Sequence, residues 1–285
     1  RMDHPRLKYQ RLIDFCKALP PTSVAVAHPC DEASLTGAMD AARAGLIAPL
    51  LVGPRDRIEA TARRFGIDIS GVPIIDVPHS HAAAERAVEL VREGSAEALM
   101  KGSLHTDELM GAVVRRESGL RTSRRVSHCF VRDVPSYSET LIITDAAVNI
   151  APSLKDKTDI IQNAIDLAHA LQFAEVRVAI LSAMETVNPD VPSTIEAAAL
   201  CKMADRGQIT GAILDGPLAL DNAINLESVA IKKIDSPVAG RANVLVVPDL
   251  ESGNMLAKSL SFLAGADAAG IVLGAKVPII LTSRA

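Results

Sequence analysis

The sequence lacks several features that proteins use to bind nucleic acids or to span membranes. It has no tryptophan, aromatic residues make up 2% of its 285 positions, and its formal net charge is −4. Nucleic-acid binders use basic surfaces and aromatic stacking platforms, so we expect no nucleic-acid partner. The longest uncharged apolar runs, such as 270–275 and 277–281, are far shorter than the roughly 20 residues that cross a bilayer. We therefore expect no membrane contact either.

Cysteine is also scarce. The chain has four cysteines, far apart and without a C-x-x-C motif: Cys16, Cys30, Cys129 and Cys201. This pattern favours free thiols in a reducing compartment. The first residues, RMDHPRLKYQRLIDF, lack the apolar centre of a signal peptide, and we expect a cytoplasmic protein.

Several motifs that bind metals and nucleotides are missing. His79 and His81 stand close together, but no third ligand follows at a suitable spacing, so we expect no metal site. The absence of G-x-x-x-x-G-K-[ST] argues against a P-loop NTPase. The absence of G-x-G-x-x-G counts against a Rossmann dinucleotide site, although not against every nicotinamide enzyme.

The sequence does contain a regular alternation of strand-like and helix-like segments. A strand over 24–27 precedes a helix over 32–44, and the same order recurs along almost the whole chain. Such alternation predicts right-handed β-α-β crossovers and a mostly parallel sheet with helices on both faces, which is the α/β fold class. Two β-rich runs, 126–131 and 141–143, lie so close together that they predict an antiparallel hairpin or a crossing between domains.

One of the predicted helices has a well-marked start. Apolar residues at helical period over 155–171 predict an amphipathic helix. Ser153 and Asp156, three residues apart, resemble its capping box.

Polar residues gather where the predicted strands end, which is where ligands collect in open α/β sheets. There are six such places: Lys101, Gly102 and Ser103 with His105 and Thr106; Asp145 with Asn149; Ser182 with Glu185–Asn188; Asp215, Gly216 and Pro217; Asp249–Asn254; and Ser283 with Arg284. Each alone could be a helix cap or a turn, because Gly, Asp, Asn and Ser favour turns. The six together favour a binding site.

Two of these places depend on where an element is expected to begin or end. A strand over 212–214 would leave Asp215 and Gly216 just beyond its carboxyl end. A helix that begins at Met255 would place Gly253 and Asn254 at its amino end, where unpaired backbone N–H groups favour an anion. Both pairs are therefore candidate substrate-binding residues.

Ser283 and Arg284 closely follow the apolar run 277–281, so a hydroxyl and a guanidinium stand at a strand's end. Arg284 offers bidentate donors to phosphate and cannot lose its charge, whereas Lys101 acts as a point charge. Ser283 can donate to a carbonyl oxygen, but it lacks the G-x-S-x-G motif and a neighbouring base that a nucleophile would need. His105 is either a general acid or base, or a histidine at a helix start that the backbone satisfies.

These residues lie in segments that closely resemble the phosphate acetyltransferase and phosphate butyryltransferase family. The matching segments include MKGSLHT, VSHCFVRDVP, LIITDAAVNIAP, VAILSAMETVNP, SPVAGRANVLVVPDLESGNMLAK and PIILTSR. They run in the family's order over 100–284, nearly two thirds of the chain, and the earlier part matches more loosely.

The resemblance implies an acyltransferase that moves an acetyl or short-chain acyl (butyryl) group reversibly between coenzyme A (CoA) and inorganic phosphate. It implies two α/β domains of the isocitrate/isopropylmalate dehydrogenase-like type, with the active site in the cleft between them. Domain I would consist of 1–132 and 270–285, and domain II of 133–269. A homodimer is also implied, with acyl-CoA and phosphate as substrates and no cofactor.

The resemblance further implies roles for the candidate residues. Arg284 would hold the phosphate, and Ser283 would stabilise the reacting acyl oxygen. The other candidates would bind phosphate or CoA: Lys101, Gly102, Ser103, His105, Thr106, Asp145, Asn149, Asp215, Gly216, Gly253 and Asn254. The base that the family is proposed to use is a carboxylate a few residues after the Ser-Arg pair, beyond Ala285. Ala146 stands where acetyl-type enzymes carry a cysteine, so the reaction requires no thiol there.

Other functions remain open at this point. A phosphate acyltransferase of another carrier is one, and a metal- and nicotinamide-dependent hydroxyacid dehydrogenase on the same architecture is another, with Asp215, Asp221 and Asp249 as conceivable ligands. A non-catalytic acyl-CoA-binding protein is a third. The acyl length is open as well, because KGSLHT, METVNPDVPST and ILTSRA look more like the butyryl-type branch while relatives of both kinds share much of the pattern.

Overall fold

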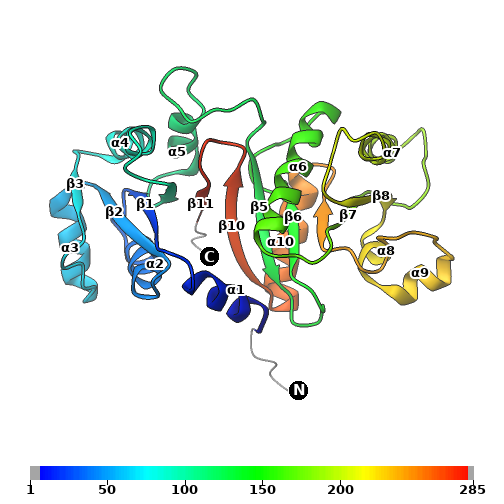
Figure 1. Cartoon of the computed structure of the whole chain (residues 1–285), viewed down its shortest axis with the longest axis horizontal. Coiled ribbons are helices and arrows are strands. Elements are labelled where there is room, and N and C mark those ends of the chain that lie inside the picture. Colours follow the sequence, from blue (N-terminus) through cyan, green and yellow to red (C-terminus); the bar gives the residue numbers. More distant parts are fainter. Residues whose placement is uncertain (1–6, 282–285) are drawn as a thin grey trace. The chain divides into compact units, whose positions relative to one another are not determined.

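The computed structural model describes residues 7–281, which divide into two compact units (Figure 1). Unit 1 contains residues 7–9 and 125–269, and unit 2 contains residues 10–124 and 270–281. The chain passes from unit 2 to unit 1 between residues 124 and 125, so β5 (Ser127–Asp133) lies in unit 1 together with its partner β6 (Leu141–Thr144). The two domains expected from the sequence stay a prediction.

The sheet of unit 2 has the strand order β3-β2-β1-β4-β11-β10. Its strands are β1 (Thr22–Ala27), β2 (Ile47–Gly53), β3 (Ile74–Asp76), β4 (Ala98–Lys101), β10 (Asp267–Leu273) and β11 (Ile279–Leu281). The pairs among β1 to β4 and the pair of β4 with β11 are parallel, whereas β10 and β11 are antiparallel. The carboxyl ends of β1 to β4 therefore meet at one edge.

Helices cover both faces of this sheet. On one face, α2 (Glu32–Arg43) and α3 (Arg55–Phe65) enclose a core that includes Val26, Leu35 and Ile58. On the other face, α4 (Ser80–Arg92) packs on β1, β2 and β4, and α5 (Thr106–Val113) packs against α4. The connections β1-α2-β2-α3-β3-α4-β4 are thus the β-α-β crossovers that the alternating pattern predicted.

The sheet of unit 1 has the order β5-β6-β9-β7-β8. In addition to β5 and β6 it contains β7 (Arg177–Leu181), β8 (Ile213–Leu218) and β9 (Val244–Val246). Strands β5 and β6 pair antiparallel, so of the two alternatives left open by the sequence the hairpin is confirmed, and the other pairs are parallel. The carboxyl ends of β6, β9 and β7 again share one edge.

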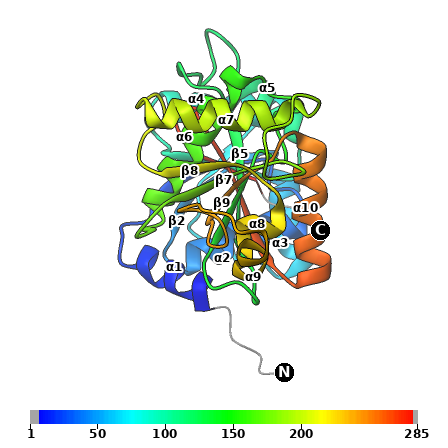
Figure 2. The same cartoon turned by 90° about the vertical axis from the view of Figure 1, so that its right-hand side faces the viewer.

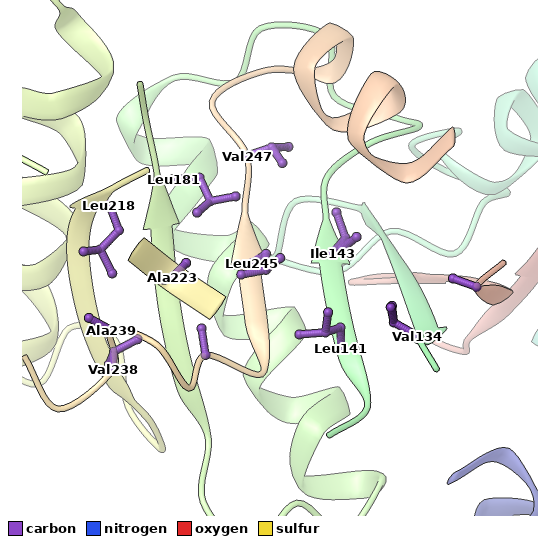
Figure 3. Close-up of a cluster of buried hydrophobic side chains, with 13 residues drawn as sticks. Val134, Leu141, Ile143, Leu181, Leu218, Ala223, Val238, Ala239, Leu245 and Val247 are labelled. Carbon is purple, nitrogen blue, oxygen red and sulfur yellow. The ribbon is translucent and has the colours of Figure 1, made fainter. Parts of the chain in front are cut away.

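Helices α6 (Leu154–Ala170) and α7 (Pro192–Asp205) cover one face of this sheet, and α8 (Leu220–Ile224), α9 (Leu226–Lys232) and α10 (Leu250–Ala264) cover the other (Figure 2). Ser153 and Asp156 form the predicted capping box of α6. The core beneath α8 and α10 gathers side chains from several strands (Figure 3), among them Ile143 of β6 and Leu245 of β9.

Two predicted boundaries near the candidate site are wrong. Strand β8 runs on to Leu218, so Asp215 and Gly216 lie within a strand, because the chain pairs with β7 on both sides of a bulge. Helix α10 begins at Leu250 and not at Met255, so Gly253 and Asn254 lie inside it. The Asp249 carboxylate caps α10 by accepting a hydrogen bond from Ser252 N at 2.8 Å.

Helix α1 (Leu7–Lys17) is an element that the sequence pattern did not reveal. Its first turn is fixed by contacts with distant residues, because Lys8 Nζ donates to Val134 O at 2.8 Å and to Tyr137 O at 2.6 Å. Among the helices of residues 7–281, none is long and apolar enough to be a membrane span. All four cysteines are free thiols, as their spacing predicted.

Candidate substrate-binding site

Five candidate residues lie where β4 ends and α5 begins, at the carboxyl edge of the unit 2 sheet. Lys101 ends β4 with only 7% of its surface exposed, and its Nζ donates to Gly102 O at 3.3 Å. His105 is the N-cap residue of α5, and Thr106 begins the helix. The His105 side chain makes no capping hydrogen bond and is exposed, so it is available to a ligand.

Gly102 is required by a close approach of two backbones. Its N–H donates to Ala27 O at 2.8 Å, where β4 passes the end of β1. A Cβ at this position would lie 2.2 Å from Ala27 O and 2.3 Å from His28 O, and both are backbone atoms. Only glycine fits without moving one strand end away from the other.

We therefore expect Gly102→Ala to destabilise the fold by about 1–3 kcal/mol and to lower kcat/KM about 10-fold or more, because the loop must move. Gly111→Ala is the matched control, since Gly111 lies in α5 and its Cβ would meet nothing within 4 Å. The control should gain about 0.5–1 kcal/mol, because alanine favours a helix. Urea unfolding and steady-state kinetics of both variants check this, and equal behaviour of the two would contradict it.

His28 is a site residue that the sequence reasoning missed. It directly follows β1, its side chain is buried, and its φ of 58° is left-handed. Its Nδ1 lies 2.8 Å from Ser103 Oγ, and Arg57 Nη1 donates to its Nε2 at 3.4 Å. Burial, and then the Arg57 charge, lower the pKa of His28 below its usual 6.5. A polar residue straight after the apolar run 24–27 was the signal that could have found it.

The amino end of α5 lies beside these groups and carries charges of both signs. The helix dipole is positive there, and the N-cap side chain makes no capping hydrogen bond. The first turn also contains two carboxylates, Asp107 and Glu108, and Glu108 accepts a hydrogen bond from Ser80 Oγ at 2.7 Å. The positive charge of Lys101 and the backbone N–H groups thus stand beside two negative charges.

In unit 1, Asp145 and Asn149 hold a loop together. The buried Asp145 carboxylate accepts hydrogen bonds from the backbone N–H groups of His128, Ala147, Val148 and Asn149 and from Asn149 Nδ2, at 2.6–3.2 Å. Asn149 also donates from Nδ2 to Val126 O at 2.9 Å, and its Oδ1 accepts from Arg125 Nε at 2.7 Å. These contacts satisfy both side chains within the protein, so the structure gives them a scaffolding role.

The other unit 1 candidates lie inside regular elements. Asp215 Oδ1 accepts from Gly216 N at 2.8 Å, and a Cβ on Gly216 would lie 2.7 Å from Ile180 Cβ. A Cβ on Gly253 would lie 2.6 Å from Val247 Cγ2, so this glycine lets α10 approach its neighbours. The anion site expected at Gly253 and Asn254 is therefore not at a helix start.

Lys157 is a second residue that the sequence reasoning missed. It lies near the start of α6, is 5% exposed, and forms an ion pair with Glu196 of α7. Its charge also helps to lower the pKa of Asp249, after the hydrogen bonds from Ser252. A lysine within a helical stripe looks solvent-exposed in the sequence, and only the packing of α6 against α7 buries it.

Residues 7–281 contain no group of three side chains that could hold a metal ion. His79 Nδ1 accepts from Ala82 N at 3.1 Å as the N-cap of α4, and His81 pairs with Glu85 at 3.3 Å. Of the conceivable dehydrogenase ligands, Asp221 lies 3.5 Å from Lys232 Nζ, while Asp249 caps α10. Ser283 and Arg284, the predicted catalytic pair, lie outside the described residues.

The fold and these edges define a class: an α/β protein of two units, with polar loops at the carboxyl ends of parallel strands. The family model described as "Phosphate acetyl/butaryl transferase" matches residues 80–285. The chain is 63% identical over 278 residues to a phosphate acetyltransferase of Rhizobium meliloti, covering 98% of this chain and 88% of that protein. It is 39% identical over 277 residues to a phosphate butyryltransferase of Clostridium acetobutylicum, covering 97% and 92%.

Solved structures agree with this assignment. A branched-chain phosphotransacylase from Enterococcus faecalis V583 superposes with a TM-score of 0.80 at 30% identity, over 93% of this chain and 92% of the other. A putative 4-hydroxythreonine-4-phosphate dehydrogenase from Salmonella typhimurium, with a TM-score of 0.60 and 14% identity over 93% and 91% of the chains, shares the fold alone. The chain belongs to the phosphate acetyl/butyryl transferase family, and it is an acyltransferase.

Proposed function

We propose that, within this family, the chain transfers an acetyl group between CoA and inorganic phosphate. The observation that carries the proposal is the identity of 63% to a phosphate acetyltransferase, compared with 39% to a phosphate butyryltransferase. The segments KGSLHT, METVNPDVPST and ILTSRA, which look butyryl-type, do not outweigh that difference over nearly the whole chain. Acetyl-CoA and phosphate are then the substrates in one direction, and acetyl phosphate and CoA in the other.

The chemistry is an attack of sulfur on an acyl carbon. The CoA thiol gives its proton to a base, and the thiolate forms a C–S bond while the C–O bond to phosphate breaks and phosphate leaves with the electron pair. Holding both substrates together makes this attack effectively intramolecular. Charge develops on the acyl oxygen and on the departing phosphate, so fixed donors accelerate the step.

The proposed donors follow from their chemistry. Arg284 would donate two parallel N–H···O hydrogen bonds to the phosphate, and Ser283 would donate a hydrogen bond to the acyl oxygen. Lys101 and the backbone N–H groups at the amino end of α5 would bind the other anionic substrate, CoA, despite the carboxylates of Asp107 and Glu108 in the same turn. Asp145 and Asn149 would act by holding their loop, because their hydrogen bonds are already satisfied within the protein.

We also propose that the enzyme needs no metal or organic cofactor, acts in the cytoplasm and forms a homodimer. Neither proton transfer nor acyl transfer in this reaction requires an oxidant, a reductant or an electron sink. Four free thiols support a reducing compartment. The homodimer rests on the family resemblance.

The test is a kcat/KM series from acetyl-CoA to hexanoyl-CoA with phosphate, following free thiol, with and without EDTA. We expect acetyl-CoA to be preferred, with each extra methylene changing kcat/KM by about 10–200-fold when it does not fit the pocket. EDTA should change nothing. A preference for butyryl-CoA would contradict the acetyl assignment, EDTA-sensitive nicotinamide reduction would indicate a dehydrogenase, and CoA binding without turnover would indicate a binding protein.

A further inference from the structure

The buried histidine at the end of β1 has hydrogen bonds that join it to the loop after β4. We propose that His28 is a positioning residue, whose imidazole and backbone carbonyl fix the Gly102–Ser103 loop in the geometry that binds substrate. The inference rests on the proposed function, since it assumes that this loop contacts a substrate of the acyl transfer. His28 itself would touch neither the acyl group nor the phosphate.

Four short contacts tie His28 to its surroundings. Ser103 N and Ser103 Oγ both donate to His28 O, each at 2.8 Å. The third contact joins Nδ1 of the His28 ring to Ser103 Oγ at 2.8 Å. In the fourth, His28 N donates to Val52 O at 2.7 Å. The loop after β4 is thereby fastened to β1 and, through β1, to β2.

These contacts define the protonation state of the ring. A hydroxyl carries one hydrogen, so when Ser103 Oγ donates to His28 O, the proton between Oγ and Nδ1 belongs to the imidazole. Nε2 then has a free lone pair, which accepts from Arg57 Nη1. The lowered pKa, caused first by burial and then by Arg57, agrees with a neutral ring of this tautomer.

The backbone of His28 contributes to this arrangement. Its φ of 58° lies in the left-handed region, which is uncommon for residues other than glycine, although Asn, Asp and His are enriched among the exceptions. In this conformation His28 O accepts a hydrogen bond from Ser103 N, and the His28 ring contacts the Ser103 hydroxyl. Gly102 beside it has no room for a side chain, since a Cβ would lie 2.3 Å from His28 O. One residue therefore sets both the backbone path and the side-chain direction of the loop.

The experiment compares three variants with the parent chain. His28→Gly removes the ring but suits the left-handed backbone, and His28→Asn suits that backbone while restoring a donor near the Nδ1 position. Arg63→Ala is the matched control, because Arg63 is an exposed arginine of the same helix, α3, and lies outside the contacts of His28 described above. We expect His28→Gly to lower kcat/KM about 10- to 100-fold, since a displacement of about 1 Å can have that effect. The kcat/KM of His28→Asn should recover to within about 5-fold of the parent value, and the kcat/KM of Arg63→Ala should equal the parent value.

The changes in KM and kcat for each substrate distinguish a positioning role of His28 from partial unfolding of the protein. A loop that contacts one ligand should change KM for one substrate and leave KM for the other unchanged, whereas partial unfolding would lower kcat for both. The inference is overturned if His28→Gly has the kcat/KM of the parent, or if the glycine and asparagine variants lose kcat/KM equally. If His28→Gly does not fold, His28→Asn decides alone: activity near the parent supports the inference, and a loss as large as that of Gly102→Ala overturns it. A parent chain that transfers no acyl group would instead refute the proposed function.

Discussion

Asp145→Ala is expected to lower the free energy of unfolding by about 3–4 kcal/mol, the largest stability effect that we predict for a single side chain. The substitution would leave the backbone N–H groups of His128, Ala147, Val148 and Asn149 without their acceptor in a buried loop. Unpaired buried donors each have a substantial cost, which water entering the loop offsets in part. The measurement is equilibrium unfolding in urea.

Asp249→Ala is the control for this prediction. Asp249 also accepts hydrogen bonds from Ser252 N and Ser252 Oγ, but it does so at the start of α10 and is less buried. Loss of an N-cap costs about 1 kcal/mol. Asp145→Asn keeps one acceptor oxygen, so its free energy of unfolding should lie between those of the parent and of the alanine variant. A loss in Asp145→Ala no larger than in the control would show that the loop does not depend on this carboxylate.

Arg284→Ala is expected to lower kcat/KM about 100- to 1,000-fold, the range seen when a donor to transition-state charge is removed. A guanidinium gives two parallel donors to phosphate and stays charged at every working pH, and nothing else in the ILTSRA segment offers this. Because phosphate carries its charge in both directions of the reaction, the forward and reverse rates should fall together. Initial rates with acetyl-CoA plus phosphate and with acetyl phosphate plus CoA measure this.

Arg284→Lys and Arg206→Ala are the controls. Lysine keeps the charge but not the planar fork, so it should recover part of the lost activity. Arg206 is exposed at the carboxyl end of α7, and its loss should leave the rates unchanged. If Arg284→Ala has kinetics close to those of the parent, Arg284 is not part of the site. If Arg206→Ala loses as much activity as Arg284→Ala, the rates depend on the overall charge of the protein and not on the position of Arg284.

Short-range sequence signals were sufficient for most of the fold. The amphipathic helix predicted over 155–171 nearly coincides with α6 (Leu154–Ala170), since apolar periodicity acts within one helix. Ser153 and Asp156 cap α6 as predicted, because a capping box needs only residues three positions apart. The predicted strand over 24–27 ends at the same residue as β1, because an apolar run marks a buried strand.

Long-range packing decided the rest. The polar residues before Met255 favour a loop by propensity, yet α10 begins at Leu250 because Asp249 caps it and Gly253 packs near Val247 and Ala146. Gly216 looked like a turn residue and proved to be a point of contact with β7. Propensity describes what a segment prefers alone, and a neighbouring strand or helix can override it.

The sequence by itself determined the α/β class, the family and the polar segments from which a site can be built, because these depend on periodicity and on the order of motifs along the chain. Only the tertiary structure decided which polar side chains are already engaged. Asp145 is satisfied by its own loop, whereas His28 meets Ser103 across 75 positions of sequence. Hydrogen bonds between residues so far apart leave no local pattern, since folding alone brings their atoms together.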